Sequence, residues 1–459
     1  MTSHHPPFIP PAPPVHAKDL PLWRLMRNVI QSSLSVWPDY AFDVMFSQKR
    51  MLGIDTVLMN DPEGIRHVLS SDAANYRRPM PIIRVVRPLV GSGIFLAEGG
   101  EWRRQRRALA PAFTPAAANL LVPHFHGAAQ HLLGAIEGRQ EVNLSAAFQD
   151  TALEAVLRAL FSKPQSAFRD RLAGLIRSYT SGPGRPALLD GIARKEDSFA
   201  VTIRGRRRFQ TEWLGAIEAV VTGRKASRTS GAARDLLDQL LDLSDAETGE
   251  GLSNEDIRDQ CGTMFFGGSE TTARLMFWAC YLLAQDRETQ TMLRTEISAF
   301  APERAGNIED LRNWPRLRNV LLEAMRLYPP VPHILRGAIA AETVCGEPIP
   351  AGAQVWISPW VLHRHRKFWR HPTAFMPERF AGQQAPWVQT PGYIPFGAGP
   401  RICLGLHFAL AEAQIVLAHL LSRFRISLPG AEEVMPVGRV TIEPSVEPGF
   451  ELERVGKCG

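Results

Sequence analysis

One cysteine lies in a setting that could make its sulfur the ligand of a metal. Cys403 follows a glycine-rich loop and precedes residues 404–424, whose Leu and Ala content predicts a helix. Gly397 and Gly399 carry no Cβ, so the loop can turn tightly and approach a flat ligand closely. The dipole and the free amide hydrogens at a helix N-terminus stabilise negative charge, which predicts a lowered pKa for the Cys403 thiol. Arg401 adds positive charge nearby.

A buried, inert cysteine is the commoner fate of a lone thiol. That explanation accounts for Cys403 itself, but it does not account for the loop glycines, Arg401 and the following helix together. We therefore favour a metal-bound thiolate at this position.

A second group of reactive side chains lies inside a long apolar helix. Ser253 and Asp256 form a capping box, and the helix that they open is predicted to run to about Leu283. Within it stands the sequence GGSETT, residues 267–272, and its two glycines cost about 1 kcal/mol each relative to alanine. Close helix packing would explain the glycines alone. An acid next to an alcohol, Glu270 and Thr271, favours a functional site.

Two weaker patterns each place two residues on one face of a helix. Trp102 and Arg106 are one turn apart, and their indole and guanidinium groups can both donate hydrogen bonds to a carboxylate. Glu323 and Arg326 are spaced as i and i+3. Either pattern alone is common by chance, so the order of the motifs along the chain matters more than any one of them.

That order resembles the cytochrome P450 family. The loop matches the haem-binding signature FGxGxRxCxG at every fixed position, from Phe396 and Gly397 to Cys403 and Gly405. The resemblance covers residues 40–450 and implies a mainly α fold with a smaller β region. It also implies haem b (iron protoporphyrin IX) between the long central helix and the cysteine-loop helix. Cys403 would be the axial iron ligand, whose electron donation favours O–O cleavage.

The resemblance assigns further roles to residues around the haem. Thr271 would hold the oxygen that is being activated, or its water, and Glu270 would relay protons as a general acid. The haem propionates would be bound by four residues of matching position, with His333 as a less certain further donor: Trp102, Arg106, Arg336 and Arg401. Thr272 would be structural, as would a charge network of Glu323, Arg326 and Arg379 that supports the cysteine loop.

Length and composition set the frame for this site. A chain of 459 residues predicts about three domains from length alone, yet no low-complexity linker divides residues 40–455. We therefore expect a proline-rich segment, 1–39, extended over its first 21 residues, and one haem domain, 40–459. The five cysteines form no CxxC pair, which favours a reducing compartment. No apolar run reaches about 18 residues and no signal-peptide core is present. The expectation is a cytoplasmic, bacterial-type protein without a membrane anchor.

The predicted elements fit that frame. Helical periodicity marks residues 116–137, 143–161, 166–181, 205–223, 235–243 and 317–327. Residues 345–358 are predicted to form a hairpin that turns at Pro350-Ala-Gly352. The histidine pairs His124-x-His126 and His363-x-His365 lack the partners that a zinc site needs.

The predicted activity is monooxygenation of a hydrophobic small molecule by a monomeric enzyme using O2. No flavin- or nicotinamide-binding extension follows the cysteine signature, so electrons are expected from a ferredoxin or flavodoxin with an NAD(P)H-dependent reductase. A net charge of +6 comes without a nucleic-acid-binding motif. We interpret the basic cluster at residues 103–107 as a surface for an acidic electron-transfer partner. Residues 80–97 and 165–215 are expected to line the substrate pocket. Arg84 and Arg87 could anchor a substrate carboxylate there, but we expect them at the surface.

The sequence leaves two other functional classes open. One is a peroxide-driven peroxygenase or a haem-thiolate isomerase, although such relatives often lack the acid–alcohol pair. The other is a non-enzymatic haem sensor, for which no output segment is apparent.

Overall fold

A single long helix, α12 (Asn254–Gln285), runs through the molecule and organises its helical part. The predicted capping box is present at its start. Ser253 Oγ accepts from the Asp256 amide at 3.0 Å, and the Asp256 carboxylate accepts from the Ser253 amide at 3.1 Å. From Ala273 to Leu283 every residue of α12 is buried, so this half of the helix is enclosed on all sides. The predicted end at about Leu283 is confirmed to within two residues.

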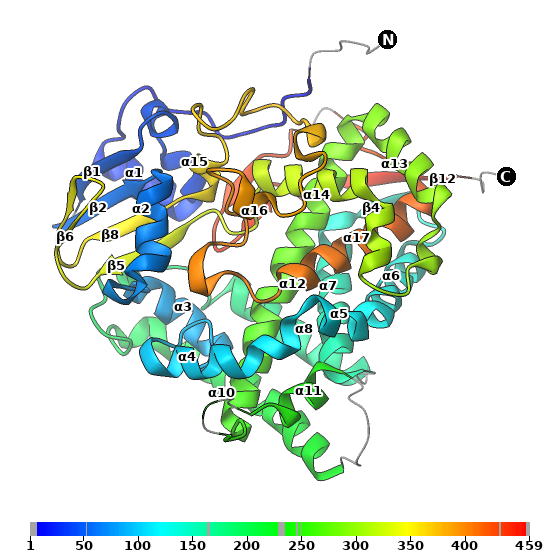
Figure 1. The fold of residues 1–459 in the computed structure, drawn as a ribbon, viewed down its shortest axis with the longest axis horizontal. Coiled ribbons are helices and arrows are strands. Elements are labelled where there is room, and N and C mark those ends of the chain that lie inside the picture. Colours follow the sequence, from blue (N-terminus) through cyan, green and yellow to red (C-terminus); the bar gives the residue numbers. More distant parts are fainter. Residues whose placement is uncertain are drawn as a thin grey trace.

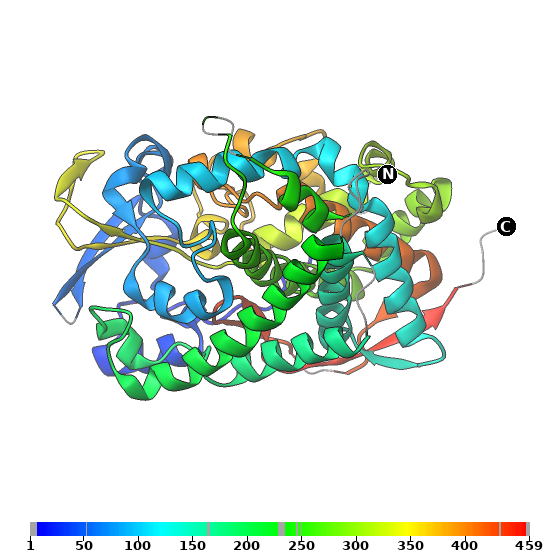
Figure 2. The same cartoon turned by 90° about the horizontal axis from the view of Figure 1, so that it is seen from below.

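The structure is a computed structural model that describes residues 7–51, 53–162, 166–227, 235–244, 247, 249–430 and 433–455. Helices form most of these residues, and a strand-rich part lies at one end of the molecule (Figures 1 and 2). The α-helices are α1 (Leu22–Gln31), α2 (Pro62–Arg66), α3 (Met80–Val90), α4 (Gly99–Leu109), α5 (Pro115–Ala118), α6 (Val122–Ile136), α7 (Leu144–Phe161), α8 (Ser166–Ser181), α9 (Leu188–Ile192), α10 (Ala200–Ser227), α11 (Leu236–Asp242), α12, α13 (Arg287–Ala299), α14 (Pro315–Leu327), α15 (Pro359–Leu362), α16 (Pro386–Gln389) and α17 (Leu406–Arg423).

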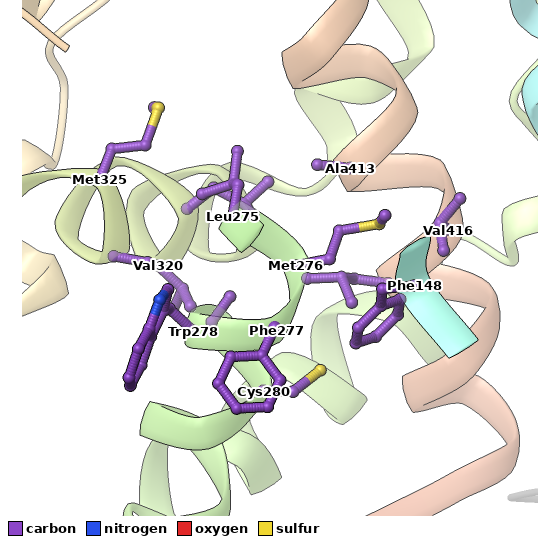
Figure 3. Packing of buried hydrophobic residues seen from close by; sticks show 14 of the residues in the cluster. Phe148, Leu275, Met276, Phe277, Trp278, Cys280, Val320, Met325, Ala413 and Val416 are labelled. Atoms are coloured by element: carbon purple, nitrogen blue, oxygen red, sulfur yellow. The ribbon is translucent and has the colours of Figure 1, made fainter. Parts of the chain in front are cut away.

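The largest hydrophobic cluster joins α12 to the helices around it. Figure 3 shows how the buried half of α12 meets three neighbouring helices. The side chains that it labels there are Phe148 from α7, Val320 and Met325 from α14, and Ala413 and Val416 from α17. This packing fixes α17, and therefore the loop before it, relative to α12.

The strands are β1 (Phe46–Met51), β2 (Ile54–Met59), β3 (Tyr76–Arg77), β4 (Glu141–Asn143), β5 (Ile334–Ala338), β6 (Glu342–Val344), β7 (Glu347–Ile349), β8 (Gln354–Ile357), β9 (Phe424–Ser427), β10 (Pro436–Gly438), β11 (Ile442–Pro444) and β12 (Gly449–Arg454). The main sheet has the order β1-β2-β8-β5-β3, and its β2–β8 pair is parallel.

The hairpin predicted for residues 345–358 is wrong in its pairing. The turn before Ala353 exists, with Gly352 at φ 79°, but β7 and β8 on its two sides do not pair with each other. β7 pairs with β6 through a tighter turn at Cys345 and Gly346, both of positive φ, while β8 enters the main sheet between β2 and β5. β7 lies between two turns and could pair across either of them. It pairs with β6 across the two-residue turn at Cys345 and Gly346, a length that favours hairpins.

The N-terminal segment lies across the surface before α1 begins. Residues 7–15 contain neither helix nor strand, as predicted. The carbonyl oxygen of Phe8 accepts from the Phe375 amide at 2.8 Å, and that of Pro11 accepts from the Tyr328 hydroxyl at 2.8 Å. Helix α1 was not predicted. Within the described part of the chain, no helix combines the length and the apolarity that a membrane crossing requires.

Candidate functional site

The cysteine loop is held by its own backbone. The Cys403 amide donates to the Phe396 carbonyl at 2.9 Å, and the Ile402 amide donates to the Gly399 carbonyl at 3.0 Å. Gly397 and Gly399 have φ values of 73° and 69°, a region that favours glycine. The loop glycines therefore serve the conformation that the sequence predicted.

Gly399 is also required for packing. A Cβ at this position would lie 2.2 Å from the carbonyl oxygen of Leu69, so no side chain fits there. The neighbouring segment, η3 (His67–Ser71), is a π-helical turn that rests directly on the cysteine loop. A larger residue at position 399 would force η3 and the cysteine loop apart.

Cys403 stands before the helix rather than in its first turn. α17 begins at Leu406, with Gly405 as its N-cap. The Cys403 side chain is accessible on one side. Burial raises the pKa of its thiol, against smaller lowering effects from the Gly405 amide and the Arg106 guanidinium. The predicted lowered pKa is therefore wrong for the protein alone, because desolvation of the thiol outweighs the effects of the Gly405 amide and Arg106. A bound metal cation would supply the missing stabilisation of the thiolate.

The two glycines of α12 have different surroundings. A Cβ on Gly268 would lie 2.8 Å from Val156 Cγ2, so Gly268 allows α7 to pack closely. A Cβ on Gly267 would meet nothing within 4 Å, and Gly267 is exposed in the middle of this otherwise well-buried helix. Close packing thus explains Gly268, whereas the open position at Gly267 leaves room beside the helix. Leu404, next to Cys403, packs against the hydrophobic cluster to which Phe265 of α12 belongs.

Thr271 and Glu270 point to different partners. The Thr271 hydroxyl, one turn after Gly267, donates to the Gly267 carbonyl. The Glu270 carboxylate is paired with Arg274 at 2.7 Å and accepts from Gln149 at 3.3 Å. The structure therefore places Thr271 beside the open position at Gly267, and it holds Glu270 in an ion pair against α7.

Thr272 is buried, and within the described residues its hydroxyl has no hydrogen-bond partner.

Arginines from three segments gather next to the loop. The Arg401 guanidinium lies over the Trp102 ring, with 4.6 Å to the ring centroid, and it also pairs with Glu98. Arg78 pairs with the same carboxylate at 3.3 Å. Burial, together with the nearby positive charges, lowers the pKa of Arg78 to about 9 and that of Arg336 to about 10. Arg78 and Arg401 thus share one carboxylate, and Arg336 lies near enough to be affected by the charges of Arg401 and Glu98.

This excess of positive charge is the test of whether a haem fits. The arginine cluster consists of Arg78, Arg336 and Arg401 with Glu98, and it has two positive charges in excess. The two propionates of a haem would neutralise both of them. An accessible sulfur in the loop and an open position at Gly267 on α12 complete a site for a flat, anionic, iron-bearing group. The residues present therefore fit a haem.

Arg78 is the residue of this cluster that the sequence did not point to. It lies between β3 and α3 and belongs to no motif, so only its burial beside Glu98 identifies it. Arg106 donates to the Ile402 carbonyl at 3.2 Å, which supports the loop beside Cys403. The sequence-predicted Trp102, Arg106, Arg336 and Arg401 are thus brought to one region.

The structure does not bring His333 to that region. Its ring nitrogens bond the hydroxyls of Ser358 at 3.1 Å and Ser33 at 2.9 Å. Its ring stands 5.8 Å from that of Trp37 and 5.4 Å from that of Trp356. Both nitrogens are therefore engaged away from the loop.

The predicted charge network is present and fully buried around Glu323. Arg326 donates to both of its carboxylate oxygens, at 2.7 and 2.8 Å, and Arg379 donates to one of them at 3.2 Å. Arg326 also donates to the carbonyls of His363 and Ala374. These bonds tie α14 to the chain before the cysteine loop, which is a structural role.

Arg84, which was expected at the surface, is buried. Its guanidinium pairs with Asp190 at 2.8 Å, and Arg206 pairs with the same carboxylate at 2.7 Å. Arg84 also donates to three carbonyls of residues 195–198. It therefore fastens α3 to the α9–α10 region and is not free to bind a substrate carboxylate.

Comparison with known proteins agrees with this geometry. The sequence model of the cytochrome P450 family matches residues 45–446. Human cytochrome P450 4F8 is 30% identical over 423 residues, which cover 84% of this chain and 78% of that protein. Cyclooctat-9-en-7-ol 5-monooxygenase of Streptomyces melanosporofaciens is 31% identical over 351 residues, 75% of each chain. The crystal structure of the haem domain of cytochrome P450DA has the same fold, with a TM-score of 0.78, 24% identity and 98% of each chain covered.

The chain therefore belongs to the cytochrome P450 family. It is a haem-dependent monooxygenase that uses O2 and takes electrons from a redox partner.

Proposed function

We propose that this enzyme binds haem b through Cys403 and hydroxylates a hydrophobic small molecule. The observation that carries the proposal is the accessible Cys403 sulfur beside an arginine cluster whose charge matches two propionates. Arg78, Arg336 and Arg401 bind the propionates, and Arg106 holds the loop. When bound in this way, the haem supplies the activation of O2 and the transfer of one oxygen atom.

Thr271 and Glu270 handle protons in this proposal. The Thr271 hydroxyl lies beside the open position at Gly267 and binds a water there once it turns away from the Gly267 carbonyl. Glu270 delivers protons only after it leaves its ion pair with Arg274. Proton supply thus includes a change of partner at Glu270, which makes it a gated step.

A hydrophobic substrate suits the partly buried apolar side chains that pack against the hydrophobic cluster to which Phe265 of α12 belongs. They include Ile82, Ile83, Phe95 and Phe266. Phe95 and Phe266 meet edge to face at 5.4 Å between ring centroids. By its name, a relative acts on cyclooctat-9-en-7-ol, a cyclic alcohol. A cyclic, largely apolar molecule is accordingly the class of substrate to test first.

Electrons come from a separate ferredoxin or flavodoxin with its NAD(P)H-dependent reductase. The basic cluster predicted to receive this partner is smaller than expected. Arg103 is exposed, but Arg104 pairs with Glu101 at 2.7 Å and Arg106 bonds the loop. Docking therefore depends on Arg103 more than on its neighbours. The enzyme works as a monomer in the cytoplasm and binds no nucleic acid. Free thiols at Cys261, Cys280, Cys345 and Cys403 support the reducing compartment.

The test is an absorption spectrum of the haem-loaded protein, followed by reconstitution of turnover with redox partners. The reduced protein with carbon monoxide should show the absorption of thiolate-ligated haem. Cys403→Ser should lose it, and the matched control Cys345→Ser should keep it. Turnover of a cyclic apolar substrate should then require NAD(P)H with a ferredoxin or flavodoxin chain. Turnover with peroxide but not with the redox chain would instead identify a peroxygenase. A normal thiolate spectrum in Cys403→Ser would refute the haem assignment.

A further inference from the structure

Three potential metal ligands meet at the edge of the strand-rich part, apart from the cysteine loop site. They are His67 of η3, Asp72 directly after η3, and Glu342, the first residue of β6. One ligand atom from each lies within 4.8 Å of the other two. β6 stands at the far left of Figure 1, in the strand-rich part. The fold thus joins residues about 270 positions apart in the chain.

The pairing inside this group leaves negative charge over. His67 Nε2 lies 2.8 Å from one Glu342 oxygen, and Asn75 donates to the other at 2.9 Å. Within the described part of the chain, the Asp72 carboxylate forms no hydrogen bond and no ion pair, although it faces the same point. Two carboxylates and one imidazole therefore converge at one point.

A buried hydroxyl without a partner points at the same group. Tyr76 is only 3% exposed, and its hydroxyl makes no well-aligned hydrogen bond among the described residues. The hydroxyl lies beside the Glu342 carboxylate. The Tyr76 ring meets the His67 ring edge to face, with 6.5 Å between centroids. Buried polar groups are normally satisfied, so this hydroxyl indicates a missing neighbour.

We propose that His67, Asp72 and Glu342 bind a divalent transition-metal cation of the zinc type. One imidazole nitrogen and two carboxylate oxygens are ligands that zinc accepts, and the two carboxylates neutralise its charge. The fourth position takes a water that hydrogen-bonds the Tyr76 hydroxyl. The bond from Asn75 to the second oxygen of Glu342 orients that carboxylate, as supporting residues of metal sites do.

A surface cavity beside His67 gives the cation a route to the site. It is lined by Glu63, Arg66, His67, Thr343, Val344 and Cys345. Arg66 brings a positive charge to this cavity, but it pairs with Glu63 at 3.1 Å and donates to Ser71 at 3.3 Å, so it does not occupy the ligand group.

Other histidines that could compete for zinc are engaged. His126 bonds His419 at 2.8 Å and the Ala305 carbonyl at 2.7 Å. His363 accepts from the Ile394 amide at 3.0 Å and contacts the Met325 carbonyl at 3.2 Å. Both ring nitrogens of His126 and of His363 are thus engaged.

The position of the site suggests what the cation would do. η3 carries His67 at one end, and its Leu69 carbonyl rests on Gly399 of the cysteine loop. A cation shared with Glu342 would fasten η3 to β6 and stiffen the surface on which the loop rests. The role is structural, and it shows as stability of the haem-loaded protein.

The experiment uses the full-length, haem-loaded protein after removal of metals with a chelator. Zinc is added, excess is removed by gel filtration, and bound zinc is measured by mass spectrometry together with the melting temperature. We expect one zinc per chain and a rise in melting temperature of about 2 °C or more at saturating zinc. Asp72→Asn and Glu342→Gln should each weaken zinc binding at least about 10-fold and abolish the rise.

Glu63→Gln, in the same cavity but outside the ligand group, is the matched control and should bind zinc as the parent protein does. The haem spectrum of each variant reports that it has folded. Less than one zinc per chain in the parent, or equal binding in Asp72→Asn and Glu63→Gln, would overturn the site. Binding of calcium or magnesium in preference to zinc would refute the assigned class of metal.

Discussion

Arg78 offers a sharp test of the arginine cluster, because its removal should have opposite effects with and without haem. Arg78 is largely buried and shares Glu98 with Arg401, and burial and the neighbouring arginines lower its pKa to about 9. In the protein without haem, Arg78→Met relieves repulsion, so the melting temperature should stay the same or rise. With haem, the variant loses a charge-assisted hydrogen bond to a propionate, worth about 1.5–3 kcal/mol.

That loss corresponds to roughly 10- to 100-fold weaker haem binding, since about 1.4 kcal/mol is a factor of ten. The assay is the rate of haem transfer to an excess of an apo-haem acceptor protein, followed by absorption, with melting curves of the apo forms. Arg77→Met is the matched control, because Arg77 is the adjacent, exposed residue of β3. Equal haem loss from Arg78→Met and Arg77→Met would refute the cluster as the propionate site.

Three further predictions concern stability and coupling. Asp190→Asn breaks a buried pair with Arg84 and should cost about 3–5 kcal/mol in urea unfolding, whereas Glu196→Gln, in an exposed pair, should cost less than about 1 kcal/mol. Burial lowers the pKa of His363 from 6.5 to about 3. Between pH 3 and pH 6.5 the unfolded chain therefore binds a proton at His363 that the folded chain does not bind. The contribution of His363 to the free energy of unfolding is therefore complete above pH 6.5, and it is smaller by roughly 2 kcal/mol at pH 5. His363→Gln should flatten the pH dependence of unfolding, and an unchanged slope would contradict this. Thr271→Ala should uncouple oxygen reduction from product formation, and unchanged coupling would exclude the proposed role of its hydroxyl.

The sequence predicted the residues whose roles depend on local spacing. The capping box at Ser253, the pair Glu323–Arg326 and the left-handed loop glycines are all short-range patterns, and the structure contains each of them. The helix predicted from residue 116 begins as short turns and becomes α6 at Val122, where Pro123 occupies the first turn.

The sequence could not predict features set by distant neighbours. Arg78 acquires its role from Glu98 and Arg336, and Arg84 is buried only because Asp190 is brought to it from another helix. The thiol pKa of Cys403 depends on how tightly the fold encloses the loop, which outweighs the helix end. The pairing of β7 with β6 was decided by competition between two turns that are both favourable locally.

The cysteine loop has a consequence for the order in which this protein is made. Its supports come from far upstream: Arg106 reaches Ile402 across 296 residues, and Arg401 reaches Ala97 across 304. Translation at about 5–20 residues per second separates the two sides of each contact by roughly 15–60 s. During that interval Arg106 and Ala97 cannot form their contacts with the cysteine loop, because the loop has not yet been synthesised. Haem capture through Cys403 must therefore follow synthesis of nearly the whole chain, and a ribosome-bound chain stalled before residue 403 should retain no thiolate-ligated haem.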